Sequence, residues 1–248
     1  MRHVVAISGG KDSTALALRL RDVMPAVKFE FLCTPVGNEP PELFQHLDKL
    51  EAELGPIMRL RPLGEGDQLK ALIEREKMIP NFRARFCTRI LKIVPTIEYL
   101  KAVAPCVQYV GLRADEETRQ GIYGTMDGVS QSYPFREWGW GLSEVVEYLE
   151  HRGVSVPQRT DCAWCFHQKL VEWWNLWRKY PEAYAGAESF ESEFGHTFRS
   201  PERDTWPTGL KGLRERFEAG HKPRGAENTL QGTLWNCDKD ATCRVCTL

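Results

Sequence analysis

The chain has no apolar run that approaches the roughly 20 consecutive residues needed by a membrane-spanning helix, so we expect no membrane span. Its formal net charge is only −1 at pH 7, which excludes a protein that coats nucleic acid by charge alone but permits a local basic patch. Internal repeats and low-complexity stretches are also absent from the sequence. What remains is an ordinary globular chain of 248 residues, of which 42% are hydrophobic, enough to bury a core.

Cysteine is too sparse and too unevenly spaced for a disulfide scaffold, with eight in the whole chain. The first apolar run begins at residue 4, so we expect no signal or transit peptide before it. In a chain without an export signal, cysteines are free thiols or metal ligands more often than disulfide partners. We therefore expect a cytoplasmic protein with candidate metal ligands.

The beginning of the chain is its most informative stretch. Apolar residues at positions 4–7 predict a strand, and Ala-Leu-Ala-Leu-Arg-Leu at positions 15–20 predicts a helix. Between them lies Ser-Gly-Gly-Lys-Asp-Ser at positions 8–13. Its glycines permit positive φ angles, and the N-terminus of the following helix attracts anions. A turn that uses glycine for geometry alone is the other interpretation, but the hydroxyls and the lysine favour a phosphate site.

This spacing differs from the Gly-x4-Gly-Lys-Ser/Thr loop of common nucleoside triphosphatases and from the Gly-x-Gly-x-x-Gly of dinucleotide-binding proteins. It resembles the loop of the PP-loop ATP pyrophosphatases, which split ATP between the α and β phosphates. The resemblance implies that residues 8–13 grip the β,γ-pyrophosphate of ATP. It also implies that Asp12 lies near the metal-bound phosphates, with Mg²⁺ as the metal.

Downstream of this loop, the apolar pattern alternates between strands and helices. Further strands are expected at residues 27–32, 57–60 and 107–112, and helices at residues 13–24, 42–54 and 67–77. This order predicts an α/β fold with a doubly wound, mostly parallel sheet. The later pattern is all-α, with helices expected at 142–151, 166–179, 181–194 and 207–219. We predict a nucleotide-binding α/β domain over residues 1–135 and an α-helical region rich in Cys and Trp over residues 136–248.

A basic segment at residues 83–95 combines four cations with an aromatic ring and a cysteine. Thr88 is a suitable N-cap for a helix that reaches residue 94, and Pro95 suits the first turn of the next helix. On such a helix Arg89 and Lys92 share one face. A solvated basic face is the alternative interpretation, although the embedded Cys87 favours a functional one.

The strand at residues 107–112 ends in a second polar cluster, which contains Arg113, Asp115, Glu116 and Arg119. In a doubly wound sheet this strand end lies beside the first loop. These side chains could therefore contact nucleotide phosphates, a sulfur-bearing group or magnesium. A surface turn is an equally open alternative.

Three motifs together resemble landmarks of the phosphoadenosine phosphosulfate reductase family, over residues 1 to about 120. They are Ser-Gly-Gly-Lys-Asp-Ser at 8–13, Cys-Thr-x-x-Leu-Lys-x-x-Pro at 87–95 and Gly-Leu-Arg-Ala-Asp-Glu-x-x-Arg at 111–119, with a looser match at 34–41. The resemblance implies an adenine nucleotide α-hydrolase fold with the ligand across the strand ends. True reductases also carry a Glu-Cys-Gly-x-His element, which this chain lacks. Its Cys-x-x-Cys at 162–165 looks more like the PP-loop ATPases of DNA phosphorothioation systems, and is comparable to the iron–sulfur tRNA thiolases of the same superfamily.

Cys162 and Cys165 form a Cys-x-x-Cys pair, whose two sulfurs can both reach one metal. Cys87 is the third candidate ligand, because it lies on the strand-end side of the predicted sheet. A [4Fe–4S] cluster needs three or four such soft ligands, so these cysteines predict one. The candidates for the fourth ligand are Cys246, which we prefer, Cys237, Cys243 and His167. Zinc is the main alternative to iron–sulfur, and a redox dithiol is a weaker one.

These motifs predict an ATP pyrophosphatase that adenylates a nucleic acid for sulfur transfer, with DNA backbone thiolation preferred over tRNA base thiolation. Lys11, Asp12 and Arg113 are the catalytic candidates: Asp12 and Mg²⁺ align the triphosphate, while Lys11 and Arg113 balance charge on the α-phosphate. The nucleotide-binding candidates are Ser8, Gly9, Gly10, Lys11, Asp12, Ser13, Gly111, Arg113 and Arg119. The expected protein partner is a sulfur donor such as a cysteine desulfurase, and the oligomeric state is left open.

Two other functions fit the sequence. A sulfonucleotide reductase would release sulfite and would need a nucleophilic cysteine such as Cys246. A non-catalytic nucleotide-binding module would instead hold a structural zinc. The polar loops at residues 196–207 and 221–224 could contact a phosphate backbone, although solvated loops are the alternative.

Overall fold

A computed structural model of the chain describes residues 1–119, 125–201 and 204–226. Its centre is a five-stranded sheet in the order β3-β2-β1-β4-β5, in which every neighbouring pair is parallel. The strands are β1 (Arg2–Ala6), β2 (Phe29–Cys33), β3 (Ile57–Arg59), β4 (Cys106–Tyr109) and β5 (Val129–Ser132). The predicted doubly wound, parallel sheet is therefore confirmed. Because the strand order reverses between β1 and β4, the ends of these two strands form the crevice where open α/β sheets bind ligands.

Strand β5 is missing from the sequence prediction. Its residues are Val-Ser-Gln-Ser, and none of them is fully buried. It pairs with β4 alone, at the edge of the sheet. An edge strand needs little apolar character, so its sequence pattern was too weak to detect.

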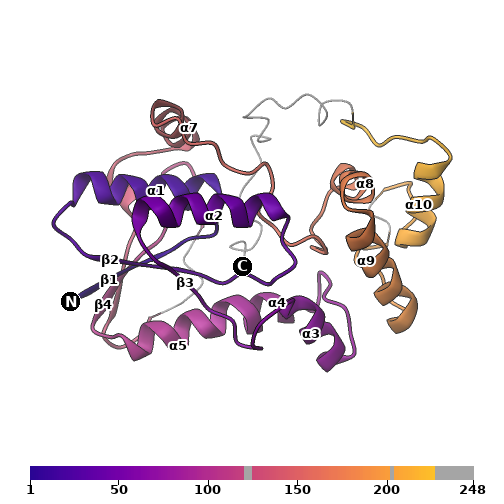
Figure 1. The fold of residues 1–248 in the computed structure, drawn as a ribbon, viewed down its shortest axis with the longest axis horizontal. Coiled ribbons are helices and arrows are strands. Elements are labelled where there is room, and N and C mark those ends of the chain that lie inside the picture. The colour runs from indigo at the N-terminus through magenta and orange to yellow at the C-terminus, as the bar shows by residue number, and fades with distance from the viewer. Residues whose placement is uncertain (120–124, 202–203, 227–248) are drawn as a thin grey trace.

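One face of the sheet is covered by α1 (Lys11–Val23), α2 (Pro41–Leu54) and α7 (Leu142–His151) (Figure 1). Helix α1 buries residues almost all round, because it lies between the sheet and its neighbouring helices. Val145 and Leu149 of α7 share a hydrophobic cluster with Leu16 and Leu20 of α1. This cluster contains residues from both sides of the predicted boundary at residue 135. The division into domains at residues 1–135 and 136–248 stays a prediction. A short helix, α6 (Pro134–Glu137), leads into this part of the chain.

The opposite face carries α3 (Gln68–Glu76), α4 (Phe86–Thr88) and α5 (Val94–Ala102), with a π-helical segment, η1 (Arg89–Ile93), between the last two (Figure 1). Leu100 and Val103 pack there against Val4 and Leu32 of the sheet.

The basic segment differs from its prediction. Thr88 has helical backbone angles instead of capping a new helix, and the chain continues through Pro95. Proline has no N–H to donate. The helix just before it has π-helical hydrogen bonds, in which the N–H of Val94 donates to the carbonyl of Arg89, five residues earlier. The Thr96 hydroxyl also donates to the Lys92 carbonyl at 2.7 Å. Pro95 lies in the first turn of α5, as predicted, but η1 runs into α5 without a break.

The C-terminal helices are α8 (Leu170–Lys179), α9 (Pro181–Phe194) and α10 (Leu210–Glu218). Their core includes Trp173 and Trp174, and it also takes in Leu72 and Ile73 of α3. Helix α8 begins four residues later than expected, because residues 166–169 continue the turn that carries the Cys-x-x-Cys pair. Within the part of the chain that the structure describes, no helix is both long enough and apolar enough to cross a membrane.

Candidate functional site

The loop between β1 and α1 is built around Gly9. Its φ of +77° lies in the left-handed region, which residues with a side chain rarely adopt. A Cβ there would also lie 2.3 Å from Leu43 Cδ1 on α2. Gly10 has an ordinary φ of −79° and is the N-cap of α1. Because Gly10 has no side chain to cap the helix, the first N–H groups of α1 can serve a ligand.

Two serines lock this loop. The Ser13 hydroxyl accepts from the Ser8 N–H at 3.1 Å and lies 3.1 Å from the Gly10 carbonyl, to which it can donate. The two hydroxyl oxygens are 3.0 Å apart. Ser8 and Ser13 were predicted to bind the nucleotide, and here they fix the shape of the loop. Their role toward a nucleotide stays a prediction.

The three catalytic candidates meet at one point. Arg113 donates to both carboxylate oxygens of Asp12 at 3.1 and 3.2 Å, and Lys11 Nζ lies 3.4 Å from Asp12 Oδ2. Lys11 and Arg113 are 7% and 4% exposed, so two nearly buried cations converge on one carboxylate. Burial lowers the pKa of Arg113, but the surrounding carboxylates, first among them Asp12, raise it by more. The net effect is a pKa above the ordinary value for arginine. The guanidinium therefore stays charged and can bind an anion.

Arg119 reaches this site only through a neighbour. Glu116 is 6% exposed, and its carboxylate pairs with both Arg113 and Arg119. Arg136, which sequence reasoning missed, donates to the carbonyls of Glu116 at 2.9 Å and Arg119 at 2.6 Å. Gly111 packs closely on the start of α1, where an added Cβ would lie 3.5 Å from the Asp12 carbonyl oxygen. Two residues, Glu116 and Arg113, therefore separate the predicted Arg119 from Asp12 in this chain of ion pairs.

Three of the predicted metal ligands share a second site. Cys87, Cys162 and Cys165 line one small cavity of about 30 Å³, together with Lys92 and His167. Across residues 1–119, 125–201 and 204–226, however, no three His, Cys, Asp or Glu side chains are arranged so that they could hold a metal ion. The three thiols therefore lie around one cavity, but they are not arranged as the ligands of one metal ion. Cys246, Cys237 and Cys243 lie outside the described residues.

The thiols of the cavity differ in acidity. A hydrogen bond between Cys162 and Cys165 raises the pKa of Cys162, as does burial, and it lowers the pKa of Cys165 against the effect of burial. Burial raises the pKa of Cys87, while the nearby Lys92 opposes that change. Cys165 is therefore the thiol that ionises most readily, and a thiolate is the form that binds metals and attacks electrophiles.

The turn that carries the Cys-x-x-Cys pair has a buried polar scaffold. Gln168 is fully buried; its amide oxygen accepts from Arg159 at 2.6 Å and its amide nitrogen donates to the Ala163 carbonyl at 2.5 Å. Arg159 also donates to the Cys162 carbonyl at 2.6 Å, and the Ala163 N–H donates to the Asn38 carbonyl at 2.6 Å. Sequence reasoning missed these residues. Their closeness to the two cysteines was the available indication.

A short piece of chain joins the two sites. Thr160 Oγ1 lies 3.6 Å from the position that a Cβ on Gly10 would take. Two residues later, Cys162 lines the thiol cavity. Two residues span at most about 7 Å, so the thiol cavity lies close to the β1–α1 loop.

The loop after β2 adds a buried carboxylate. Oε1 of Glu39 accepts from the Val36 N–H at 2.7 Å, whereas its buried Oε2 has no hydrogen-bond partner among the described residues. Burial raises the pKa of Glu39, and the charge of Lys92 opposes that change. A polar group held this way can serve a ligand near the thiol cavity, because Val36 and Lys92 line it.

Comparison with known proteins gives one family match and distant relatives. The model of the phosphoadenosine phosphosulfate reductase domain matches residues 2–158. A relative, the "Uncharacterized 37.8 kDa protein in gpa 5′ region" of Escherichia phage 186, is 20% identical over 292 residues, which cover 92% of this chain and 83% of that protein.

Two solved structures have similar folds at low identity. One is the phosphoadenylyl-sulfate reductase of Candida auris in a phosphate complex, with 15% identity and a TM-score of 0.48 over 63% of this chain and 75% of that chain. The other is the U34-tRNA thiolase NcsA of Methanococcus maripaludis with its [4Fe–4S] cluster, with 14% identity and a TM-score of 0.40 over 90% of this chain and 82% of that chain. Both are too distant to support an inference about this chain's chemistry.

Proposed function

Since the chain belongs to the phosphoadenosine phosphosulfate reductase domain family, we propose that it is a sulfur-transfer enzyme that splits ATP into AMP and pyrophosphate. The proposed acceptor is a nucleic acid. An oxygen of the acceptor attacks the α-phosphorus of ATP, pyrophosphate leaves, and the acceptor is adenylated. A sulfide nucleophile then takes the place of that oxygen, which departs with AMP.

The observation that supports this proposal most directly is the meeting of Lys11 and Arg113 at the N-terminus of α1. Two nearly buried cations and the open helix N-terminus together suit a triphosphate. Preformed positive charge stabilises negative charge that develops on phosphate oxygens in the transition state. In this proposal the loop holds the β,γ-pyrophosphate, while Lys11 and Arg113 face the α-phosphate.

Asp12 is the residue that would hold Mg²⁺. Its oxygens now bind Arg113 and lie near Lys11, so an incoming triphosphate would share these cations and leave the carboxylate to a metal. Carboxylate oxygens are hard ligands of the kind that Mg²⁺ prefers, and they fit this role. The metal would neutralise charge on the pyrophosphate leaving group.

The thiol cavity is the proposed source of sulfur. Thiolates are the ligands that iron–sulfur clusters and zinc prefer, so the chemistry of Cys87, Cys162 and Cys165 suits either group, although these side chains are not arranged to hold a metal ion in this structure. When bound, an iron–sulfur cluster would supply a site from which sulfur is delivered. This chain's own residues hold the cysteine turn in place through Gln168 and Arg159. They also keep that turn next to the β1–α1 loop, where the adenylated acceptor would lie.

The experiment has two parts. Protein purified without oxygen is assayed for iron, acid-labile sulfide and zinc; pyrophosphate and AMP are then measured with ATP, Mg²⁺ and either DNA or tRNA. We expect iron and sulfide to be present, and pyrophosphate release to depend on one of the two nucleic acids. Lys11→Met should lower that rate by about 10²–10³-fold, as loss of one preorganised donor does. The exposed Lys28→Met is the matched control. Release of ADP and phosphate, or equal rates for the two variants, would contradict the proposal.

Sulfonucleotide reduction is the second candidate, because the family match names that activity. The missing Glu-Cys-Gly-x-His element argues against it. Sulfite release from phosphoadenosine phosphosulfate with a thiol reductant, in the absence of ATP, would favour the reductase. Zinc without iron, with nucleotide binding but no turnover, would favour a non-catalytic module instead.

A further inference from the structure

The loop between α3 and α4 presents an aromatic ring to solvent. Phe82 is 68% exposed, whereas every other Phe, Tyr and Trp in the described part of the chain is buried or half-buried. Burying a large apolar ring stabilises the folded protein, so an exposed Phe82 gives up that stabilisation. A single exposed ring has no significance by itself, and its surroundings decide the matter.

The loop holds Phe82 outward by hydrogen bonds of its own. Asn81 and Ala84 exchange two backbone hydrogen bonds of 3.2 and 3.1 Å, which close a tight turn. Oδ1 of Asn81 accepts from the N–H groups of Arg83 at 2.9 Å and Ala84 at 3.0 Å. Phe82 and Arg83 stand at the tip of this turn. Their exposure therefore follows from a closed turn with its own hydrogen bonds.

Cationic residues follow Phe82 along the chain. Residues 80–97 contain Arg83, Arg85, Arg89 and Lys92 but no Asp or Glu, in a chain whose net charge is −1. Arg83 and Arg89 are exposed, and within the described residues neither forms an ion pair with a carboxylate. Exposed charges of one sign with an aromatic ring between them are the composition that binds single-stranded nucleic acid.

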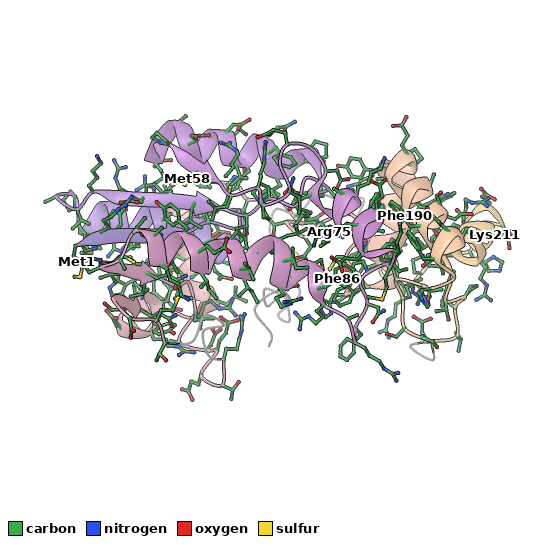
Figure 2. The ribbon with its side chains drawn as sticks, turned by 90° about the horizontal axis from the view of Figure 1, so that it is seen from below. Met1, Met58, Arg75, Phe86, Phe190 and Lys211 are labelled. Atoms are coloured by element: carbon green, nitrogen blue, oxygen red, sulfur yellow. The ribbon has the colours of Figure 1, made fainter. Side chains whose placement is uncertain are left out.

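The ring also lies beside the thiol cavity. It packs edge-on against His167, with ring centroids 6.1 Å apart and planes at 81°. His167 lines the cavity that holds Cys162 and Cys165, and Pro80 and Arg85 from the Phe82 loop line it too. Figure 2 shows the adjoining residue Phe86 next to the C-terminal helices, where this cavity lies.

We propose that the Phe82 loop, residues 80–85, is the platform on which the acceptor strand docks. A base of single-stranded nucleic acid stacks on Phe82, and the neighbouring phosphates bind Arg83 and Arg89. This deepens the proposed function and rests on it for the identity of the acceptor. The docking places the nucleic acid backbone at the mouth of the thiol cavity. Neither polar loop singled out from the sequence, 196–207 or 221–224, is part of this surface.

The test measures binding of short fluorescent single-stranded DNA and RNA by anisotropy, without ATP. Phe82→Ala should weaken binding about 5- to 150-fold, as loss of one stacked base does, while Phe82→Tyr should bind as the wild type does. Arg83→Gln should lower the slope of log affinity against log salt by about 0.7, as loss of one phosphate contact does. Met58→Ala on β3 is the matched control, because Met58 is 47% exposed and lies far from Phe86 in Figure 2.

The outcomes separate this inference from the proposed function. If Phe82→Ala binds both strands as tightly as Met58→Ala does, the platform is refuted, even if the wild type releases pyrophosphate. If Phe82→Ala loses binding while the wild type never releases pyrophosphate, the platform stands and the proposed function fails. The preferred strand, DNA or RNA, identifies the class of acceptor. Binding to neither strand would overturn the inference, and the loop would then be read as a protein contact.

Discussion

Replacing Gly9 by alanine tests the geometry of the phosphate loop against a control one residue away. In Gly9→Ala the new side chain would occupy a φ of +77°, which costs about 1–2 kcal/mol for a residue with a Cβ. Its Cβ would lie 2.3 Å from Leu43 Cδ1, and Leu43 is buried and packed, so overpacking adds about 1–3 kcal/mol. The lower entropy of the unfolded chain returns about 0.4–1 kcal/mol.

The expected loss in the free energy of unfolding for Gly9→Ala is therefore about 3 kcal/mol. For Gly10→Ala the added Cβ meets only ordinary contacts, 3.5 Å from Ser8 Oγ and 3.6 Å from Thr160 Oγ1. Its N-cap cost and its entropic gain nearly cancel, so we expect a change within about 0.5 kcal/mol.

Urea denaturation followed by circular dichroism measures both variants, with the m value as a check that the same surface unfolds. Thermal unfolding should place Gly9→Ala about 6–12 °C below the wild type, at about 2–4 °C per kcal/mol for a chain of this size. Equal stabilities for the two variants, or a less stable Gly10→Ala, would refute the reasoning.

Four further predictions concern charge and scaffold. Burial raises the pKa of Glu191 to about 7 from 4.5, so the folded chain binds the proton more tightly and the free energy of unfolding should fall as pH rises between those values; Glu191→Gln should abolish this slope in pH-dependent denaturation. Burial lowers the pKa of His46 to about 4 from 6.5, so stability should fall as pH drops through that window, and His46→Gln should remove the fall. Arg113→Met removes the cation shared by Asp12, Asp115 and Glu116, although Lys11 and Arg119 still pair with two of these carboxylates, so it should lower the free energy of unfolding by about 3 kcal/mol, whereas the exposed Arg75→Met should change it by less than about 1 kcal/mol. Gln168→Leu removes the two side-chain hydrogen bonds that Gln168 makes to Arg159 and Ala163. Elemental analysis should then find less bound metal per chain, while circular dichroism should show that the helices are retained.

The loop between β1 and α1 could be recognised from the sequence as a candidate phosphate site because its motif is local. A strand, two glycines and a helix start follow one another directly, and the hydroxyls and lysine lie among them. The meeting of Asp12 with Arg113 was also predictable, although 101 residues separate them. In a parallel sheet, strands β1 and β4 end at the same edge, so topology alone brings these residues together.

Other parts of the site had no local pattern. Gln168 and Arg159 form hydrogen bonds within the turn that carries the cysteines. The residues around them show neither helix nor strand periodicity, so the sequence did not indicate this role. Thr88 continues a helix instead of capping one, because a π-helical segment connects α4 to α5, where Pro95 lies in the first turn. Strand β5 was too short and too polar to detect.

By itself, the sequence determined the alternation of strands and helices that predicts a parallel sheet, and the motifs that indicate the family, because each depends on residues that are close together or repeat with a regular period. The sequence had grouped Cys87 with Cys162 and Cys165 as candidate ligands, and the structure places all three around one cavity. The tertiary structure alone decided that Thr160 brings this cavity beside the β1–α1 loop. It also decided that the Phe82 ring stays exposed. These outcomes depend on how α3 and the C-terminal helices share one core. They result from packing between segments that are distant in the sequence, which cannot be predicted from composition or residue spacing.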